Sequence, residues 1–443
     1  MGYLSVTDSD REAMLEAIGV SSIDELFEQI PAGVRFEREL ELEPALSEQE
    51  LVDHLTELAG RNVDMTRELS FLGAGIYDHY VPAYVDAMLA RGEFLTAYTP
   101  YQPEMSQGVL QAIFEYQTAI CELTGMDVSN ASGYDGTTVA ADACYVAKHA
   151  TGRSKVVLAE AVNPQVRQVV KTYAPGFGLE VVEVPHRDGV TDPGELRAAA
   201  EDAACVIFQQ PNFFGCLEPA PDLAAAANET GALAVAHVDP VSLGVLEAPG
   251  AYGCAIALGE GQSAGNYQSY GGPHYGFLAV RSEFIRRMPG RIVGETTDVE
   301  GKRGYVLTLQ TREQHIRREK ATSNITTNQT LLALAGLMHL SWLGPQGLRE
   351  LGETCLALGR YAQERLVDAG CELLFPDQAT FKEFAVRVGR PAEEAIAAAR
   401  ERGVHPGYAL KRDYAGMEDA LLVCVTERKT PEEIDRLAEA LAA

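Results

Sequence analysis

Lysine is scarce in this chain of 443 residues, and its distribution is uneven. The lysines stand at positions 148, 155, 171, 302, 320, 382, 411 and 429, so none falls between Lys171 and Lys302. A basic surface is lacking as well, because 36 Lys and Arg residues face 64 Asp and Glu residues, which gives a formal net charge of −28. Nucleic acid binding depends on clustered Lys and Arg that neutralise phosphates. The composition therefore argues against a nucleic acid partner, whereas strong acidity by itself assigns no function.

Long apolar runs and paired cysteine motifs are also missing. No segment approaches the roughly 18 uninterrupted apolar residues of a membrane span, and the N-terminus lacks a basic start followed by an apolar stretch. The 8 cysteines form no CxxC pair and no zinc-ligand spacing, and most stand in apolar runs, where cysteine acts as a small hydrophobic residue. We therefore expect no membrane span, no export and no metal site, and we expect the reduced cytoplasm as the compartment.

Residues 155 to 280 alternate between apolar runs and helical stretches. The runs at 155–158, 179–184, 205–208 and 233–238 recur about every 25 residues, a spacing typical of βαβ crossovers in a largely parallel sheet. Ligands of such sheets lie beyond the carboxyl ends of the strands, where Asn212 and Asp239 fall. The pattern predicts an α/β fold with a site near Asp239.

The glycine-rich stretch 258–280, LGEGQSAGNYQSYGGPHYGFLAV, follows the strand that ends at Asp239. A strand with a terminal acid, a short strand, a glycine-rich loop and another strand match the cofactor site of pyridoxal phosphate enzymes of the large aspartate aminotransferase type. In those enzymes the acid pairs with the pyridinium nitrogen, and a lysine about 20 to 30 residues later forms the Schiff base. That lysine is missing here. Either the chain is not such an enzyme, or another chain completes its chemistry.

The ends of the chain predict two further parts. Residues 1–60 indicate short helices that begin with capping boxes, in which a hydroxyl accepts from the N3 amide and a Glu reaches back; the pairs are Ser9/Glu12, Ser22/Glu25 and Ser47/Glu50. After a long helix at about 328–341, the pattern indicates a small α+β unit. We expect a helical arm (1–60), a large α/β domain (61–327) and a small C-terminal α+β domain (328–443).

Two loops have features that are typical of ligand contact. The small polar residues at 129–138, SNASGYDGTT, open an alanine-rich helix, and the free amides of such a helix start can hold phosphate. Tyr98 and Tyr101 lie in a proline-containing loop, where they offer flat faces and hydroxyls in a chain that cannot continue as a helix. Each loop also has a purely structural interpretation, as a common helix entry and as a cover over the core.

Three long stretches together resemble the P-protein family of the glycine cleavage system. They are 96–138, TAYTPYQPEMSQGVLQAIFEYQTAICELTGMDVSNASGYDGTT, 259–279, GEGQSAGNYQSYGGPHYGFLA, and 288–329, MPGRIVGETTDVEGKRGYVLTLQTREQHIRREKATSNITTNQ. The likeness is to the α chains of members that are made as two polypeptides. It runs from about residue 3 to the C-terminus and includes VHPGYAL at 404–410.

The resemblance accounts for the missing lysine. In this family α and β chains share the type I fold of pyridoxal phosphate enzymes and pair as αβ units, usually in an α2β2 heterotetramer, and only the β chain carries the Schiff-base lysine. Gln262 stands at the matching position here, and its amide nitrogen is not nucleophilic. The resemblance thus implies that pyridoxal 5'-phosphate is bound covalently by the partner β subunit. It leaves this chain with a vestigial pseudo-site that consists of Gln262, Asp239, Ser132 and Asp135.

The implied reaction is the decarboxylation of glycine, with transfer of the aminomethyl group to the lipoyl arm of H-protein. The resemblance implies that this chain contributes Tyr98 and Tyr101 to the entrance of the partner's active site. The loop expected at the partner's cofactor phosphate is Ser269, Tyr270, Gly271 and Gly272. A turn expected to face the same site is Thr322, Ser323 and Asn324.

Two alternatives stay open at this point. One is a self-sufficient pyridoxal phosphate enzyme that uses Lys302 or Lys320, although both stand well beyond the glycine-rich loop. The other is a non-catalytic scaffold or regulatory subunit of a complete partner enzyme. A scaffold would change the lifetime of the partner more than its turnover.

Overall fold

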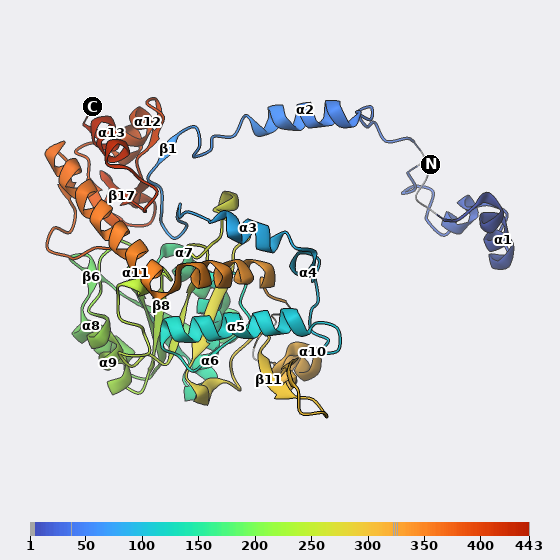
Figure 1. Ribbon diagram of the computed structural model, residues 1–443, viewed down its shortest axis with the longest axis horizontal. Helices are drawn as coiled ribbons and strands as arrows, with labels where there is room; N and C mark the ends of the chain where they lie inside the picture. Colours follow the sequence, from blue (N-terminus) through green and yellow to red (C-terminus); the bar gives the residue numbers. More distant parts are fainter. Residues whose placement is uncertain (1–4, 37, 322, 324, 326, 443) are drawn as a thin grey trace. The chain divides into compact units, whose positions relative to one another are not determined.

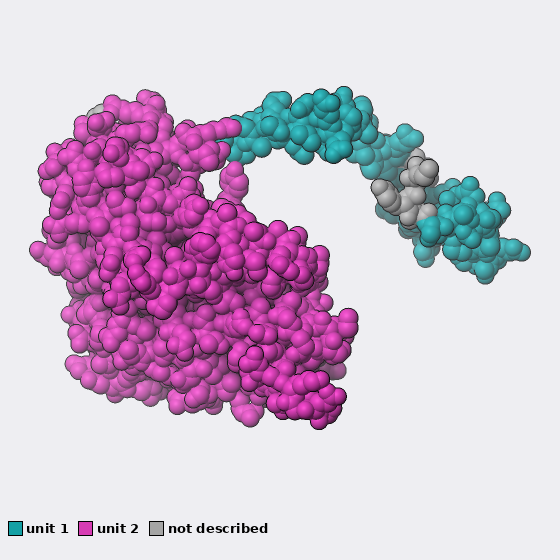
Figure 2. Space-filling model, viewed as in Figure 1, with its two compact units in different colours: residues 1–63 teal, residues 64–443 magenta. Residues whose placement is uncertain are grey.

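A computed structural model describes residues 5–36, 38–321, 323, 325 and 327–442, and it divides into two compact units, Met1–Val63 and Asp64–Ala443 (Figure 2). The first unit contains the helices α1 (Asp8–Ile18) and α2 (Glu48–Ala59). None of its described residues is buried, so these helices lack a core of their own.

Capping boxes begin both helices of this first unit. At α2, Ser47 N donates to Glu50 Oε2 over 2.8 Å and the Ser47 hydroxyl accepts from Glu50 N, as predicted. At α1 the prediction of Ser9 is wrong, because the cap is Thr7, two residues earlier, with Asp10 as the reciprocal partner. An aspartate closes such a box as well as the glutamate that the prediction required.

The second unit (Figure 1) is built around a central sheet. This sheet has seven strands in the order β2-β10-β9-β8-β7-β3-β4. In chain order the strands are β2 (Val128–Ser129), β3 (Lys155–Ala159), β4 (Glu180–Val184), β7 (Ala203–Gln210), β8 (Leu233–Val238), β9 (Ile256–Glu260) and β10 (Gly276–Val280). All neighbouring pairs from β9 to β4 are parallel, and β10 is antiparallel to β9 and to β2. The four apolar runs predicted as strands are thereby confirmed as β3, β4, β7 and β8.

Helices cover this sheet. They are α5 (Gln107–Thr124), α6 (Gly136–Thr151), α7 (Pro164–Phe177), α8 (Pro193–Ala200) and α9 (Ala220–Glu229). The inner strands β7, β8 and β10 are buried on both faces, so most of their residues are apolar and inaccessible to solvent. α6 packs on β7, β9 and β10 with a face of alanines, which lets the start of the helix lie close to the sheet.

The C-terminal part follows the helix α11 (Thr330–Asp368), which is kinked at Gly344 and Pro345. A four-stranded antiparallel sheet comes next, with the order β13-β14-β17-β16. The strands and helices of this part are β13 (Glu372–Leu373), β14 (Glu383–Arg387), α12 (Ala392–Arg400), β16 (Tyr408–Ala409), β17 (Ala420–Cys424) and α13 (Pro431–Leu441). This part has its own apolar cluster around Val386, Leu421 and Leu437. The expected domain boundaries at 60/61 and 327/328 stay predictions.

Short elements complete the second unit. They are β1 (Leu69–Ser70), α3 (Ala83–Leu89), α4 (Gly92–Leu95), β5 (His186–Arg187), β6 (Val190–Thr191), β11 (Val293–Thr297), β12 (Arg303–Leu307), α10 (Gln314–Arg317) and β15 (Val404–His405). β1 pairs with β15 beside the small sheet, and α3 packs against α11. Residues 71–82 connect β1 to α3, and we call this segment the strap. Throughout the described part of the chain, every helix is too short or too polar to serve as a bilayer span.

Candidate functional site

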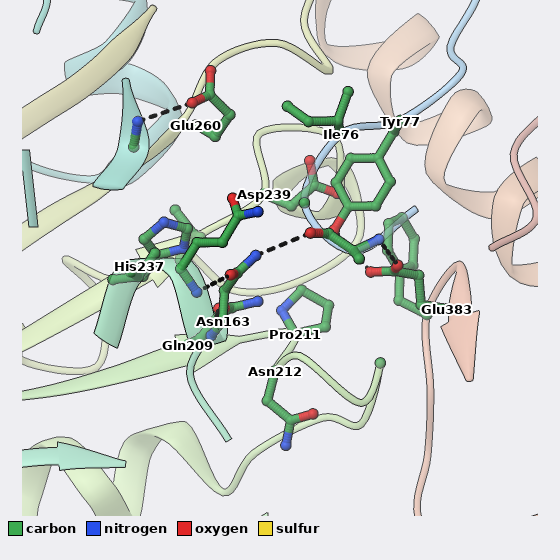
Figure 3. Close-up of a pocket in the computed structure, with 18 of the residues that line it drawn as sticks. Ile76, Tyr77, Asn163, Gln209, Pro211, Asn212, His237, Asp239, Glu260 and Glu383 are labelled. Atoms are coloured by element: carbon green, nitrogen blue, oxygen red, sulfur yellow. Dashed lines mark hydrogen bonds between the residues drawn. The ribbon is translucent and has the colours of Figure 1, made fainter. Parts of the chain in front are cut away.

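A cavity opens at the carboxyl ends of β7 and β8 (Figure 3). Its walls come from the strap, the first turns of α6 and α7, the ends of β7, β8 and β9, and the residues that lead into β14. This is the place where open α/β sheets bind their ligands. The predicted residue Asp239 lies in it, as the first residue after β8.

Asp239 is paired with a cation of its own chain. Its Oδ2 atom lies 2.7 Å from Lys382 Nζ, and both side chains are almost fully buried. Burial raises the pKa of Asp239, but the polar groups around the carboxylate, with the Lys382 ammonium first among them and Ser263 adding a hydrogen bond, together hold the pKa below its usual range. The ammonium also lies 3.5 Å from the centre of the Tyr77 ring, a cation–π contact in a desolvated setting. Lys382 therefore takes the position opposite the acid that a pyridinium nitrogen takes in type I enzymes.

Gln262 is fully used by the backbone around it. Its Oε1 atom accepts from Tyr77 N over 2.8 Å, and its Nε2 atom donates to Tyr77 O and to Asn266 O, each over 2.9 Å. The side chain is 1% exposed. The residue at the expected lysine position is thus a bridge between the strap and the glycine-rich loop.

The start of α6 holds a carboxyl group instead of a phosphate. Gly136 N donates to Glu260 Oε2 over 2.9 Å (Figure 3), and burial raises the pKa of Glu260 to about 8. Asp135 caps the same helix by accepting from Thr138 N over 2.7 Å. Ser132 is fully buried, and its hydroxyl accepts from Gln329 N over 3.1 Å. The predicted pseudo-site residues at this helix are therefore engaged within the protein.

These contacts show that the cavity does not fit pyridoxal phosphate in the manner of the type I fold. Lys382 takes the acid that would hold the ring nitrogen, and Glu260 takes the helix amide that would hold the phosphate. Gln262 offers no amine for a covalent bond. We therefore assign no step of any reaction to a cofactor bound in this cavity.

A group of metal-type ligands lies beside the cavity. His79, Cys355 and Glu427 bring a nitrogen, a sulfur and an oxygen within 4.8 Å of one another. His79 Nε2 lies 2.9 Å from Lys382 Nζ, and His79 Nδ1 lies 2.7 Å from Glu427 Oε2. Because an ammonium can only donate, Nε2 must accept, and Nδ1 then carries the proton that Glu427 accepts. The imidazole keeps no free lone pair for a metal, so the group is a hydrogen-bond chain from Asp239 through Lys382 and His79 to Glu427.

The residues predicted to reach a partner lie outside this cavity. Tyr98 is 92% exposed. Tyr101 donates from its hydroxyl to Asn328 Oδ1 over 3.1 Å, and the Arg291 guanidinium lies 5.2 Å from its ring centre. The first tyrosine of the loop is thus free on the surface while the second fastens the loop.

The predicted phosphate loop is an exposed turn. Ser269, Tyr270 and Gly271 form a single 3₁₀ turn, and Tyr270 is 86% exposed. Gly271 and Gly272 have φ values of +105° and +137°, which L side chains rarely adopt. The turn is therefore shaped for glycine and presents an aromatic ring to the outside.

Of the predicted turn at 322–324, Thr322 and Asn324 lie outside the described residues. The Ser323 hydroxyl donates to Asp142 Oδ1 on α6 over 3.2 Å. Burial raises the pKa of Asp142 to about 7. This contact connects the turn to α6, the helix that begins at the cavity.

Sequence reasoning missed Lys382 and Glu260. In the sequence Lys382 is only one of eight lysines, within the expected small domain, and no spacing rule connects it with Asp239. Glu260 stands within the glycine-rich stretch, two residues before Gln262. Its position at the end of an apolar run was the signal in the sequence, whereas its contact with the start of α6 joins residues that are 124 positions apart.

Comparisons with known proteins agree on one family. The family model described as "Glycine cleavage system P-protein" matches residues 1–441. The chain is 50% identical over 440 residues to the "Probable glycine dehydrogenase (decarboxylating) subunit 1" of Anoxybacillus flavithermus, with 99% of this chain and 98% of the relative covered. A relative of the same name from Moorella thermoacetica is 50% identical over 443 residues, with 100% of this chain and 99% of the relative covered.

Solved structures give the same picture for the fold. A crystal structure described as glycine decarboxylase (P-protein) of the glycine cleavage system, in inhibitor-bound form, matches with a TM-score of 0.92 at 44% identity, and the match covers 100% of this chain and 99% of that chain. A sphingosine-1-phosphate lyase from Burkholderia pseudomallei matches with a TM-score of 0.65 at 17% identity over 93% of each chain. A NifS-like protein matches with a TM-score of 0.60 at 12% identity, over 85% of this chain and 98% of that chain. The predicted type I fold of pyridoxal phosphate enzymes is confirmed.

Replacing Lys382 should expose the cost of the buried acid. Lys382→Met leaves Asp239 as an uncompensated buried charge, so we expect a loss of about 3–5 kcal/mol in the free energy of unfolding. The double variant that adds Asp239→Asn should recover most of this loss. Urea denaturation of the full chain measures both. Lys302→Met, which removes an exposed ion pair with Glu300, is the matched control and should cost under about 1 kcal/mol; equal losses for the two lysines would contradict the assignment.

Glu260 should make stability depend on pH. The folded protein keeps the Glu260 proton up to a pKa of about 8, whereas the unfolded chain releases it near the usual value of 4.5. Between these values the unfolded state binds fewer protons, so this group's contribution to stability falls as the pH rises. Glu260→Gln has no proton to lose. Relative to the unmodified chain, we expect it to gain on the order of 1–3 kcal/mol in the free energy of unfolding from about pH 5 to about pH 8. A difference that stays constant with pH would contradict this.

Proposed function

Since the chain belongs to the family of glycine cleavage system P-proteins, we propose that it is the first subunit of a glycine dehydrogenase (decarboxylating) made as two polypeptides. It completes the active site of a β subunit that decarboxylates glycine and transfers the aminomethyl group to the lipoyl arm of H-protein. The observation that carries this proposal is the closure of the chain's own cofactor site by Lys382, Glu260 and Gln262. A chain of this fold that cannot hold the cofactor acts through a partner that can.

Pyridoxal phosphate is the cofactor of the complex. We place it on the β subunit, attached to the lysine that this chain lacks at position 262. When bound, the cofactor supplies the electron sink that makes the loss of carbon dioxide from glycine feasible. The part of this chain is to orient the reactants and to exclude water around the reacting carbon.

The exposed aromatic loop is suited to that part. Tyr98 stands free on the surface, while Tyr101 is held by Asn328 and Arg291. Pro100, between the two tyrosines, and Pro103, two residues after Tyr101, restrict the backbone of the loop. The phenol of Tyr98 can therefore be presented at little cost in conformational entropy. We place both tyrosines at the entrance for glycine and for the lipoyl arm.

The second contribution is the turn at 269–272. Its two glycines allow the backbone to approach a ligand closely, and we place it at the cofactor phosphate of the partner. The turn at 322–324, which Ser323 fastens to α6, is the third segment that we place at the shared site.

The partners follow from the same proposal. The relatives are named as subunit 1, so a second subunit belongs to their enzyme. For this chain we propose αβ units that assemble as an α2β2 heterotetramer and receive glycine and lipoylated H-protein. We place the complex in the cytoplasm, which is supported by the free state of all 8 cysteines.

The geometry gives little support to a self-sufficient pyridoxal phosphate enzyme that uses Lys302 or Lys320. Lys302 lies in an exposed position, where it pairs with Glu300 over 2.6 Å, and neither Lys302 nor Lys320 is among the residues that line the cavity. A pure scaffold remains the competing function, and turnover measurements distinguish it from a shared active site.

The location of the cofactor can be tested directly. The reconstituted complex should be reduced with borohydride, digested and mapped by mass spectrometry. We expect stoichiometric attachment of the cofactor to one lysine of the partner and to none of the lysines of this chain. The same treatment of this chain alone is the control. Stoichiometric attachment to Lys302, Lys320 or Lys382 would overturn the proposed division of labour.

The role of Tyr98 can be tested with a single atom. Tyr98→Phe keeps the ring and removes the hydroxyl, so we expect the glycine–bicarbonate exchange rate of the reconstituted complex to fall by about tenfold or more, the effect of one lost hydrogen bond to a charged group. Cofactor content should stay unchanged.

Tyr173→Phe is the matched control for this test, because Tyr173 is another surface tyrosine, 40% exposed on α7, and its substitution should leave the rate unchanged. Full activity of the Tyr98 variant removes Tyr98 from the site. If the β subunit alone turns over as fast as the reconstituted complex and only its lifetime is shorter, this chain is a scaffold.

A further inference from the structure

The strap is fastened to the closed cofactor site by side chains from three distant parts of the chain. Gln262 forms two hydrogen bonds with the Tyr77 backbone: its Oε1 accepts from Tyr77 N, and its Nε2 donates to Tyr77 O. Glu383 Oε1 accepts from Ala74 N over 2.7 Å, and its Oε2 accepts from the Tyr77 hydroxyl over 2.8 Å. Glu427 Oε1 accepts from Tyr80 N over 2.7 Å. At Ala74, Tyr77 and Tyr80 the backbone amides of the strap are thus bonded by side chains, whereas in a sheet they would be bonded by a neighbouring strand.

The strap also fits its channel without spare room. A Cβ atom at Gly73 would lie 2.3 Å from Glu383 Oε1 and 2.6 Å from Cys424 Cβ. Gly75 has a φ of +112°, and a Cβ atom there would lie 2.7 Å from Asn163 Nδ2. These close contacts require glycine at positions 73 and 75 and fix the position of the strap against Glu383, Cys424 and Asn163.

The strap continues directly into α3, and α3 connects it to segments at the surface. Val85 of α3 packs with Leu334 and Met338 of α11. Asp86 Oδ2 accepts from the Tyr267 hydroxyl over 2.6 Å. α3 is followed by α4 and then by the loop of Tyr98. The position of the strap therefore determines where that loop begins.

Gln262 holds the second surface segment as well. Its Nε2 atom donates to Asn266 O over 2.9 Å, and Asn266 precedes Tyr267, the residue bonded to α3. The turn at 269–272 follows immediately. One buried amide thereby connects the origins of both segments that lead to Tyr98 and to Tyr270.

We propose that Gln262 is a positioning residue of the shared decarboxylation site, because it couples the strap to the glycine-rich loop and so sets the places of Tyr98 and of the turn at 269–272. The identity of that site rests on the proposed function. The amide is required by its chemistry, since Gln262 accepts one hydrogen bond and donates two. A lysine at 262 can only donate in its ammonium form, so it would leave Tyr77 N without its acceptor.

Two variants separate this role from simple packing. Gln262→Met removes all three hydrogen bonds, and hydrogen exchange of the reconstituted complex should then show about tenfold or more faster exchange in peptides from 71–82 and 263–272, with β7 unchanged. In the same complex the KM for glycine should rise and the kcat should fall, while cofactor content is retained.

Gln262→Glu adds a pH signature. A protonated glutamic acid still accepts from Tyr77 N and donates to one carbonyl, whereas the ionised form turns an acceptor toward the two carbonyl oxygens of Tyr77 and Asn266. The activity of this variant relative to the unmodified complex should therefore fall as the pH rises. A residue that only filled space would give a ratio independent of pH.

Gln117→Met is the matched control. Gln117 is buried and forms the same pair of hydrogen bonds with one backbone residue. Its Oε1 accepts from Val293 N and its Nε2 donates to Val293 O, each over 2.9 Å. Its loss should speed exchange around β11 and leave the strap and the KM for glycine unchanged.

The outcomes are distinct. Unchanged exchange of the strap in Gln262→Met overturns the coupling, and faster exchange with unchanged KM and kcat overturns the positioning role. If Gln262→Met prevents assembly, the pH series of Gln262→Glu decides the question. If the unmodified pair shows no glycine–bicarbonate exchange, the proposed function fails, whereas hydrogen exchange still tests the coupling.

Discussion

The buried ion pair between Asp239 and Lys382 is the interaction on which the rest of the site depends. The sheet delivers a carboxylate to the end of β8, where burial makes an unpaired charge expensive. A type I enzyme balances that charge with the ring nitrogen of its cofactor. Here the balancing cation comes from the residue before β14, so the charge is satisfied by folding alone. The pair also fixes the small sheet against the large one.

The position of Lys382 explains the order of the groups around it. Its ammonium faces Asp239, the Tyr77 ring and His79 Nε2. Two of these three groups belong to the strap, and the strap is further bonded to Gln262 and Glu383. A cavity that would hold a cofactor has therefore become an attachment point for a segment of backbone. The buried ends of the strands, where a type I enzyme holds its cofactor, here hold the strap of the same chain.

Local patterns gave much of this in advance, and contacts between distant residues did not. The strands β3, β7 and β8 were predictable because strands buried on both faces are rich in continuous apolar residues. The edge strand β4 was predictable from its valines, which favour strands. Gln262 was identified because a lysine is required by chemistry at one position of the motif. Lys382 was not identified, since its pairing with Asp239 depends on how β14 docks beside β8, which no local spacing encodes. The capping of α1 by Thr7 was missed because Asp10 was not considered as a reciprocal partner.

The two uses of position 262 exclude each other. A lysine there can form a covalent bond with a cofactor, but its nitrogen is then taken by the cofactor, and as a free ammonium it can only donate, so neither form holds Tyr77 N. An amide can hold the strap but has no nucleophilic nitrogen. A single chain of this fold can therefore bind the cofactor or seat the strap in this way, and not both. Under the proposed function, an enzyme of two chains obtains both: one chain keeps the reactive amine, and the other uses the same place in its fold to hold the segments that it presents to its partner.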